Sequence, residues 1–382
     1  MQHLCLLLLL LFFRKCSSYG KCPPDEPLLP CKCHHNENIQ CRQPGNYSLS
    51  HIFYSLSYWS AGSTHRHYHR TKNRQKNELH FQEFVLENPI MTVLDKNLFG
   101  LFRFEKIVFV NMEKLVRLHS NVFNGTQTTV KSLTIKGTNQ LGISFVSELF
   151  DALSTLVSVR EMHLDLENLS YLPNTGLRSL HKDSTLKLES LKIVTRALSQ
   201  IPSYAFYDLI KIRYINILSK TGIKHISGHA FNMDNGSDQT LEIDLRNNGL
   251  TNTLFEVDSF SGANRPVILE LSNNSLTKLS EKVFKKFLQI NPKNRLVVNH
   301  NPFECDCGMS WLVNNRSRYL EQVLDAICDD YAELWRLDEA YFRKCRNDTH
   351  YMPRLLLRNT CPPGGGTVLA GLIILFIAIN NL

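Results

Sequence analysis

The sequence predicts an α/β solenoid, a stack of repeated units whose short strands join into one parallel sheet. Three observations predict it: a recurring apolar pair, a phenylalanine that recurs independently of that pair, and cysteine clusters at both ends of the repeated region. The clearest copy of the repeat is Leu269-x-Leu271-x-x-Asn274-x-Leu276-x-x-Leu279, followed by Phe284. A period of roughly 20 to 29 residues with this spacing is the leucine-rich repeat.

Nine strands are predicted from the apolar pair. The interval between their first residues runs from 24, between Phe84 and Val108, to 29, between Leu133 and Met162. A strand and its return segment cannot bury their apolar face alone, so neighbouring repeats must stack into a horseshoe with the parallel sheet on its concave face. The predicted strands are Phe84–Leu86, Val108–Val110, Leu133–Ile135, Met162–Leu164, Leu191–Ile193, Asn216–Leu218, Ile243–Leu245, Leu269–Leu271 and Leu296–Val298.

Two further positions of the repeat have predicted roles. A phenylalanine closes most return segments, and Leu177 takes its place in one; the phenylalanines are Phe99, Phe123, Phe150, Phe206, Phe231, Phe260 and Phe284. The motif asparagines Asn248, Asn274 and Asn301 are expected to bond backbone groups left open where each strand ends. Earlier repeats have other residues there, which predicts a less regular N-terminal half: Pro89, Glu113, Thr138, Glu167 and Arg196.

The cysteines predict a cap at each end of the solenoid. None of the eleven lies between Cys41 and Cys305. The open ends of a solenoid expose apolar residues, and disulfide caps cover them in extracellular proteins. A zinc site would need a reducing compartment and is not predicted. The expected divisions are an N-terminal cap over 21–41, a first repeat region with a basic insertion over 42–78, repeats over 79–300, a C-terminal cap over 301–345 and a linker over 346–366.

The two termini carry targeting patterns. The apolar run from Met1 to Phe13, followed by small residues up to Gly20, predicts a signal peptide over 1–20. The C-terminal tail over 367–382 contains only twelve mostly apolar residues, Val368–Ile379, with no Lys or Arg after them. A span needs about 20 residues, so the tail predicts a glycosylphosphatidylinositol signal. Attachment at Asn359 would remove the unpaired Cys361; a single-pass span is the alternative.

Seven Asn-x-Ser/Thr sequons agree with an extracellular, cell-surface glycoprotein. They lie at Asn46, Asn124, Asn168, Asn235, Asn273, Asn315 and Asn347.

The cap residues carry a family resemblance. The stretch Asn301–Leu312 resembles the C-terminal cysteine cap of extracellular leucine-rich-repeat proteins. Together with Ala326–Cys328, Phe342–Cys345 and the N-terminal Cys22–Cys33, it is similar to a group of secreted arthropod proteins called the Oplophorus-luciferin 2-monooxygenase non-catalytic subunit. The resemblance covers most of residues 22–345 and implies a chain without catalysis of its own, which accompanies a secreted oxidase.

The resemblance also implies the disulfide pairs. They are Cys22 with Cys33, Cys31 with Cys41, Cys305 with Cys328 and Cys307 with Cys345. The chain departs from the group in its anchor-like tail and in a basic insertion, and both put a soluble companion role in doubt.

The basic insertion runs from His65 to Lys76 and contains five positive residues and no acid. Such a segment is suited to sulfated glycans, anionic lipid heads or an acidic partner. The alternative is a solvated insertion without a ligand. No metal site is predicted from its three histidines.

The concave face is the predicted binding surface for a protein partner. Side chains alternate along a strand, so four apolar residues are expected to be exposed there: Val85, Phe109, Ile215 and Ile217. An acidic stripe is expected beside them, made of Glu161, Asp165, Glu242, Asp244 and Glu270. The alternative is a register one residue away, which would move the apolar side chains into the core.

No catalytic motif is found. The sequence has no phosphate-binding glycine loop, no Gly-x-Ser-x-Gly elbow and no His-Glu-x-x-His pair. We therefore predict neither an enzyme nor a cofactor nor a nucleic-acid partner, but an extracellular protein that recognises another protein in adhesion, receptor assembly or ligand presentation. The alternatives are a companion subunit of a secreted oxidoreductase, and innate immune or sulfated-glycan recognition.

Overall fold

The computed structural model describes residues 22–23, 25–35, 37–63, 79–173, 187–207, 209–233, 238–262 and 265–345. Several predictions lie outside these residues and stay predictions. They concern the signal peptide, the basic insertion at 65–76, Leu177, the sequons at Asn235 and Asn347, and the tail with Asn359.

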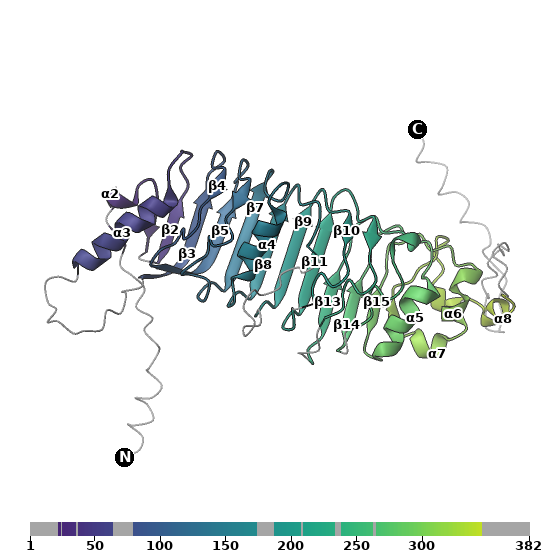
Figure 1. Cartoon of the computed structure of the whole chain (residues 1–382). Helices are drawn as coiled ribbons and strands as arrows, with labels where there is room; N and C mark the ends of the chain where they lie inside the picture. The colour runs from purple at the N-terminus through teal and green to yellow at the C-terminus, as the bar shows by residue number, and fades with distance from the viewer. Residues whose placement is uncertain are drawn as a thin grey trace, which may run out of the picture.

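The strands form one 12-stranded sheet that runs the length of the molecule (Figure 1). All neighbouring strands are parallel except the first two. The leucine-rich-repeat solenoid predicted from the apolar pairs is therefore confirmed. In sheet order the strands are β1 (Lys32–His34), β2 (Asn38–Cys41), β3 (Leu79–Glu87), β5 (Phe102–Val110), β7 (Ser132–Thr138), β8 (Glu161–Leu166), β9 (Ser190–Thr195), β11 (Tyr214–Ser219), β13 (Leu241–Asp244), β14 (Val267–Glu270), β15 (Arg295–Val297) and β16 (Val323–Leu324).

The return segments contain short strands and helices. Two small parallel sheets pair β4 (Val93–Leu94) with β6 (Arg117–Leu118), and β10 (Gln200–Ile201) with β12 (His225–Ile226). The longer returns form a 3-10 turn, η1 (Asn252–Leu254), and two helices, α4 (Val146–Ser154) and α5 (Glu281–Ile290).

The two return-segment helices are amphipathic. Helix α4 buries Val146, Leu149, Phe150 and Leu153, which fall on one face of a helix. Helix α5 does the same with Val283, Phe284, Phe287 and Leu288. Both helices therefore pack on the core side of the sheet.

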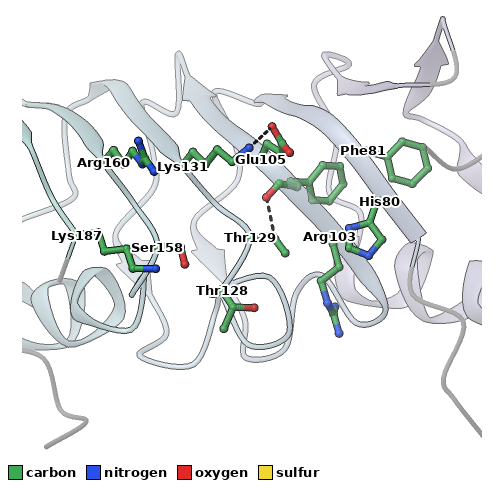
Figure 2. Close-up of a pocket in the computed structure, with 11 residues that line it drawn as sticks. His80, Phe81, Arg103, Glu105, Thr128, Thr129, Lys131, Ser158, Arg160 and Lys187 are labelled. Carbon is green, nitrogen blue, oxygen red and sulfur yellow. Dashed lines mark hydrogen bonds and ion pairs between the residues drawn. The ribbon is translucent and has the colours of Figure 1, made fainter. Parts of the chain in front are cut away.

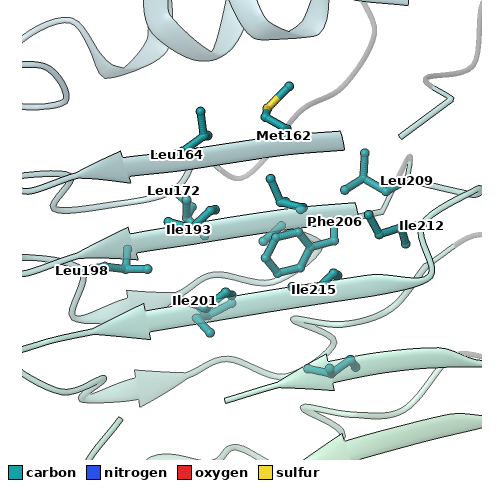
Figure 3. Packing of buried hydrophobic residues seen from close by; sticks show 14 of the residues in the cluster. Met162, Leu164, Leu172, Ile193, Leu198, Ile201, Phe206, Leu209, Ile212 and Ile215 are labelled. Carbon is teal, nitrogen blue, oxygen red and sulfur yellow. The ribbon is translucent and has the colours of Figure 1, made fainter. Parts of the chain in front are cut away.

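The core fills the space between the sheet and the return segments (Figure 3). The predicted phenylalanine row is buried, and its rings stack on one another in successive repeats. The centroids lie 5.4 Å apart between Phe206 and Phe231 and 5.5 Å apart between Phe231 and Phe260. Phe99 and Phe123 stack in the same way in the N-terminal half, at 6.3 Å.

The asparagine ladder also forms, in the C-terminal repeats. The side-chain oxygen of Asn274 accepts from the backbone N–H of Asn248 and of Leu250, each at 3.0 Å. Its amide donates to the carbonyls of Leu245 and Leu271, at 3.1 and 2.8 Å. Each asparagine thus satisfies buried backbone groups of its own repeat and of the preceding one.

In two repeats of the N-terminal half the ladder position is occupied one residue earlier than predicted, whereas Thr138 is buried at the position predicted for it. The buried Asn88 and Thr195 make the turn contacts there, with Asn88 donating to the carbonyl of Gly45 at 2.8 Å and Thr195 to that of Leu169 at 2.9 Å. Glu167 and Arg196 instead form an ion pair on the surface. These side chains are charged and long, so pairing in solvent costs less than burial at the turn.

The N-terminal cap closes the first end of the solenoid. It consists of α2 (Asp25–Leu28), the β1–β2 hairpin and α3 (Leu49–Ser63). Disulfides join Cys22 to Cys33 and Cys31 to Cys41. Phe53 on α3 is fully buried and contacts Phe84 and Phe102 of the first repeats. The sequence analysis did not predict α3.

The C-terminal cap closes the other end. Its elements are η2 (Cys307–Met309), α6 (Ser310–Val313), α7 (Arg316–Tyr319), β16, η3 (Leu334–Arg336) and α8 (Glu339–Phe342). Disulfides join Cys305 to Cys328 and Cys307 to Cys345, which completes the four pairs that the family resemblance implies. The indole N–H of Trp311 donates to the carbonyl of Leu279 at 2.9 Å and so ties the cap to the last repeats. Among the described residues, no helix is both long and apolar enough to cross a bilayer.

Candidate functional site

The candidate site is the face of the 12-stranded sheet that points away from the core, which we call the open face; it is the side expected to be concave. Parallel pairing aligns equivalent residues of successive strands into rows. One row that faces the core contains Ile107, Leu133 and Ile215, all fully buried. The adjacent row on the open face contains Thr134, His163, Lys192 and Asn216.

The prediction that Phe109, Ile215 and Ile217 are exposed is wrong. All three are in the core with no solvent-accessible surface. The predicted register was one residue off in β5 and β11. In β5 both Ile107 and Phe109 and the alternative pair of valines are apolar, so alternation alone does not choose between them.

The register of β3 was predicted correctly, but Val85 is not exposed. It lies between Gln40 and Val108 in the sheet, and 6 % of its surface is accessible. The structure therefore brings none of the four predicted apolar side chains together as an accessible patch. The acidic residues lie where they were predicted, because Glu242, Asp244 and Glu270, and also Glu161 and Asp165 on β8, lie on or beside the open face.

Asp244 is the centre of a polar cluster on β11, β13 and β14. Only 1 % of its surface is exposed, because two side chains cover it. Arg246 donates to both carboxylate oxygens, from Nε to Oδ1 at 3.0 Å and from Nη2 to Oδ2 at 2.7 Å. The hydroxyl of Tyr214 donates to Oδ2 at 3.1 Å. Such a bidentate, charge-assisted arrangement fixes the orientation of the guanidinium.

The proton affinities of the cluster follow from its geometry. Burial, then the negative charge of Asp244, raises the pKa of Tyr214 to about 12. Burial and the same charge also raise the pKa of Glu242 above its ordinary value. Burial alone would raise the pKa of Asp244, but the hydrogen bonds from Arg246 outweigh it, and the pKa is lowered. At neutral pH the cluster therefore presents a fixed ion pair beside a neutral phenol.

The middle of the open face carries charges of both signs, with Lys136 on β7, Glu161 and Asp165 on β8, and Lys192 on β9. His163 lies between Thr134 and Lys192 in the row, and Lys136 follows on β7. Burial, followed by the positive charges of Lys136 and Lys192, lowers the pKa of His163. The charges of the open face thus alternate in sign from β7 through β8 to β9, and carboxylates follow on β13 and β14.

The sequence analysis missed these basic residues as well as Tyr214 and Arg246. The sequence contained a signal for the register of β5 and β11. Lys106 lies on the same side of its strand as Val108, and Asn216 lies on the same side as Tyr214. A charged or amide side chain in a strand marks the solvent side. The side on which Lys106 and Asn216 lie would therefore have assigned both strands the register that the structure has.

The described sequons differ in their accessibility. Asn46, Asn273 and Asn315 are exposed, and Asn124 and Asn168 are partly buried. Asn124, Asn168 and Asn315 use their amides as donors, to Asn97, Asn139 and Trp311 respectively. Asn273 lies three residues after the end of β14. No group of three metal-ligating side chains occurs in the part of the chain that the structure describes.

Comparisons with known proteins give relatives of the same repeat class. No family model matches the chain. The leucine-rich repeat-containing protein 3B of mouse and of human is 25 % identical over 155 residues, which is 41 % of this chain and 47 % of the relative. The chain therefore spans about half the length of the curated relatives it matches.

Two solved structures are similar at low sequence identity. One is TLR13 in a complex with ssRNA13, with a TM-score of 0.44, 17 % identity, and coverage of 70 % of this chain and 36 % of that one. The other is human 5T4, named as Wnt-activated inhibitory factor 1 or trophoblast glycoprotein, with a TM-score of 0.40, 15 % identity, and coverage of 84 % and 98 %. The resemblance to the luciferin monooxygenase companion group stays a prediction.

Proposed function

We propose that this chain is an extracellular leucine-rich-repeat protein that recognises another protein at the cell surface through its open face. The observation that carries the proposal is the arrangement of charge on that face. The alternating charges of Lys136, Glu161, Asp165 and Lys192 adjoin a cluster in which Arg246 and Tyr214 are held in place by the buried Asp244. Positioned charges of both signs favour one docking orientation of a partner.

The four disulfides support an extracellular setting, because disulfides persist in oxidising compartments. The predicted signal peptide and lipid anchor at Asn359 would place the chain on the outer leaflet. The leucine-rich-repeat relatives agree with a role in recognition.

Site-specific cross-linking tests the proposal. A photo-reactive residue is placed at Asn216 on the open face and, as a control, at Tyr207, which is 43 % exposed in a return segment. We expect a discrete adduct with one membrane or secreted protein from Asn216 and none from Tyr207. An adduct from Tyr207 alone would contradict the assignment of the site.

A charge reversal tests whether the adduct depends on the lysines of the open face. Lys136→Glu with Lys192→Glu is expected to abolish the Asn216 adduct, because both lysines are on the open face. The matched control is Lys96→Glu with Lys114→Glu, two exposed lysines in return segments. If the adduct survives in the open-face variant, Lys136 and Lys192 do not contribute to recognition. A secreted oxidase as the captured protein would favour the companion role instead.

A further inference from the structure

A second charged surface lies at the edge of the sheet where the strands begin, which we call the entry rim. Several repeats enter their strands through an apolar residue flanked by two outward side chains, as in Ser158-Val159-Arg160 and Lys211-Ile212-Arg213. Val159 and Ile212 are fully buried and hold their neighbours in place. The entry rim is independent of the open-face cluster, because the two use different residues.

Backbone hydrogen bonds align the side chains nearest the strands into a continuous row. The N–H of Lys131 donates to the carbonyl of Glu105, that of Arg160 to Lys131, that of Glu189 to Arg160, and that of Arg213 to Glu189, all at 2.7 to 2.8 Å. Adjacent strands are about 4.8 Å apart, so the row is a regular array whose spacing the sheet fixes.

The rim has more cations than acids. Lys131, Arg160 and Arg213 leave 57, 61 and 51 % of their side chains exposed even though they contact Glu105 or Glu189. Lys187 and Lys211 lie beside them, exposed and without an ion-pair partner among the described residues. The two glutamates therefore neutralise only part of the positive charge.

The cations line two adjoining depressions rather than a flat surface. Their volumes are about 330 and 490 Å³, and Arg160 and Lys187 border both. Figure 2 shows residues that line the first depression, among them Lys131, Arg160 and Lys187 and the hydroxyl-bearing Thr128 and Ser158. The two depressions share Arg160 and Lys187, and their lining residues lie near the starts of strands that include β5, β7, β8, β9 and β11; we call this lining the groove.

We propose that the entry rim binds a linear sulfated glycan. Sulfate groups repeat along such a chain, and guanidinium and ammonium groups are suited to oxyanions. Thr128 and Ser158 offer hydroxyls to the sugar. Binding of this kind is governed by counterion release and is steeply salt-dependent.

The groove fits other polyanions less well. Single-stranded nucleic acid is bound by stacking its bases on exposed aromatic rings, whereas the aromatic lining residues Phe81 and Phe104 are fully buried. A protein interface depends on apolar or aromatic anchors at its centre, and the described lining offers charged and hydroxyl groups instead. The basic run that ends at Lys76 directly precedes β3, which enters the sheet at this rim; it therefore needs its own arm in the test.

Heparin affinity chromatography of the full-length secreted chain tests the proposal. The rim variant is Arg160→Gln, Lys187→Gln, Lys211→Gln, which leaves Glu189 paired with Arg213. We expect it to elute at clearly lower salt, with a Kd for a heparin oligosaccharide weakened on the order of tenfold or more at physiological ionic strength. The control Lys96→Gln, Lys114→Gln, Lys224→Gln loses the same charge from return segments and is expected to elute with the wild-type chain.

Three outcomes would overturn the proposal. One is equal retention of the rim and control variants. Another is loss of retention only when the charges between Arg66 and Lys76 are neutralised, which would assign the glycan to that run. The third is single-stranded DNA competing as well as heparin while desulfated heparin does not, which would show that the groove takes any polyanion. Unchanged circular dichroism of the rim variant shows that it is folded.

Discussion

His163 is a half-buried imidazole whose positive form is opposed by Lys136 and Lys192 more than it is favoured by Asp165. Burial and the two lysines beside it lower its pKa in the folded state, so the unfolded chain binds a proton more readily than the folded one as the pH falls below about 6.5. The imidazole is therefore neutral at the pH of extracellular fluid. An acidic partner on the open face would reverse this, because its charge favours the imidazolium.

We predict that Lys192→Gln raises the pKa of His163 toward its ordinary value, because one of the two opposing charges is removed. NMR titration of the histidine ring signals measures it, with His163→Gln to assign the resonance. The control Lys224→Gln removes a lysine from a return segment and is expected to leave the titration unchanged. If Lys192→Gln leaves it unchanged as well, Lys192 is not close enough to His163 to act on it.

At the same scale, Asn274 shows what one ladder amide contributes. We predict that Asn274→Ala lowers the free energy of unfolding by about 2–4 kcal/mol, because it leaves several buried backbone groups without partners. The neighbouring Asn273 is exposed with a φ of 55°, which glycine also adopts. Asn273→Gly is therefore the control, and we expect it to change stability by less than about 1 kcal/mol. Urea titration of both variants compares them.

At the scale of the element, the phenylalanine stack couples one return segment to the next. The ring centroid of Phe260 lies 5.5 Å from that of Phe231 and 6.1 Å from that of Phe284, so this side chain connects the return segments of three successive repeats. We predict that Phe260→Ala costs about 3–5 kcal/mol. Hydrogen exchange should show lost protection in β13, β14 and α5, because a solenoid repeat contacts only its neighbours. Val257→Ala, at a side chain that is 55 % exposed, is the control. Loss of protection that extends evenly to β3 would contradict this local coupling.

The strands also show how far the sequence determines the structure. Seven of the nine predicted strands have the predicted register, because in each the core pair is apolar and at least one of its flanking residues is polar or charged, as in Leu269-Glu270-Leu271. In β5 the four residues from Ile107 to Val110 are all apolar, and the side of Lys106 together with packing of Phe109 against Phe84 and Phe123 selects the core side. In β11 Asn216 marks the solvent side, between the buried Ile215 and Ile217. The Asp244 cluster was not predicted as a cluster, since Tyr214 and Asp244 meet only when β11 pairs with β13.

At the scale of the whole molecule, the two caps cover the ends of a long core, parts of which are expected to unfold separately. The Cys307–Cys345 disulfide closes a segment with a sequence separation of 38 residues. We predict that Cys307→Ser with Cys345→Ser destabilises the C-terminal cap by about 3–4 kcal/mol in the chain-entropy model. Hydrogen exchange should then be fastest in α6 to α8, intermediate in β15 and unchanged in β5. Uniform loss of protection would mean that the solenoid unfolds as one unit.

The ends of the sheet also bear on whether copies of this chain join one another. An edge strand with free N–H and C=O groups is a template on which a second copy can extend the sheet, and one way in which proteins prevent this is to make edge strands very short. Here the first strand, β1, is three residues long and runs antiparallel to its neighbour, and the last, β16, is two residues long. The short edge strands therefore block the growth of fibres by addition of further copies at either end. The number of strands in the sheet is set by one polypeptide and does not rise with protein concentration.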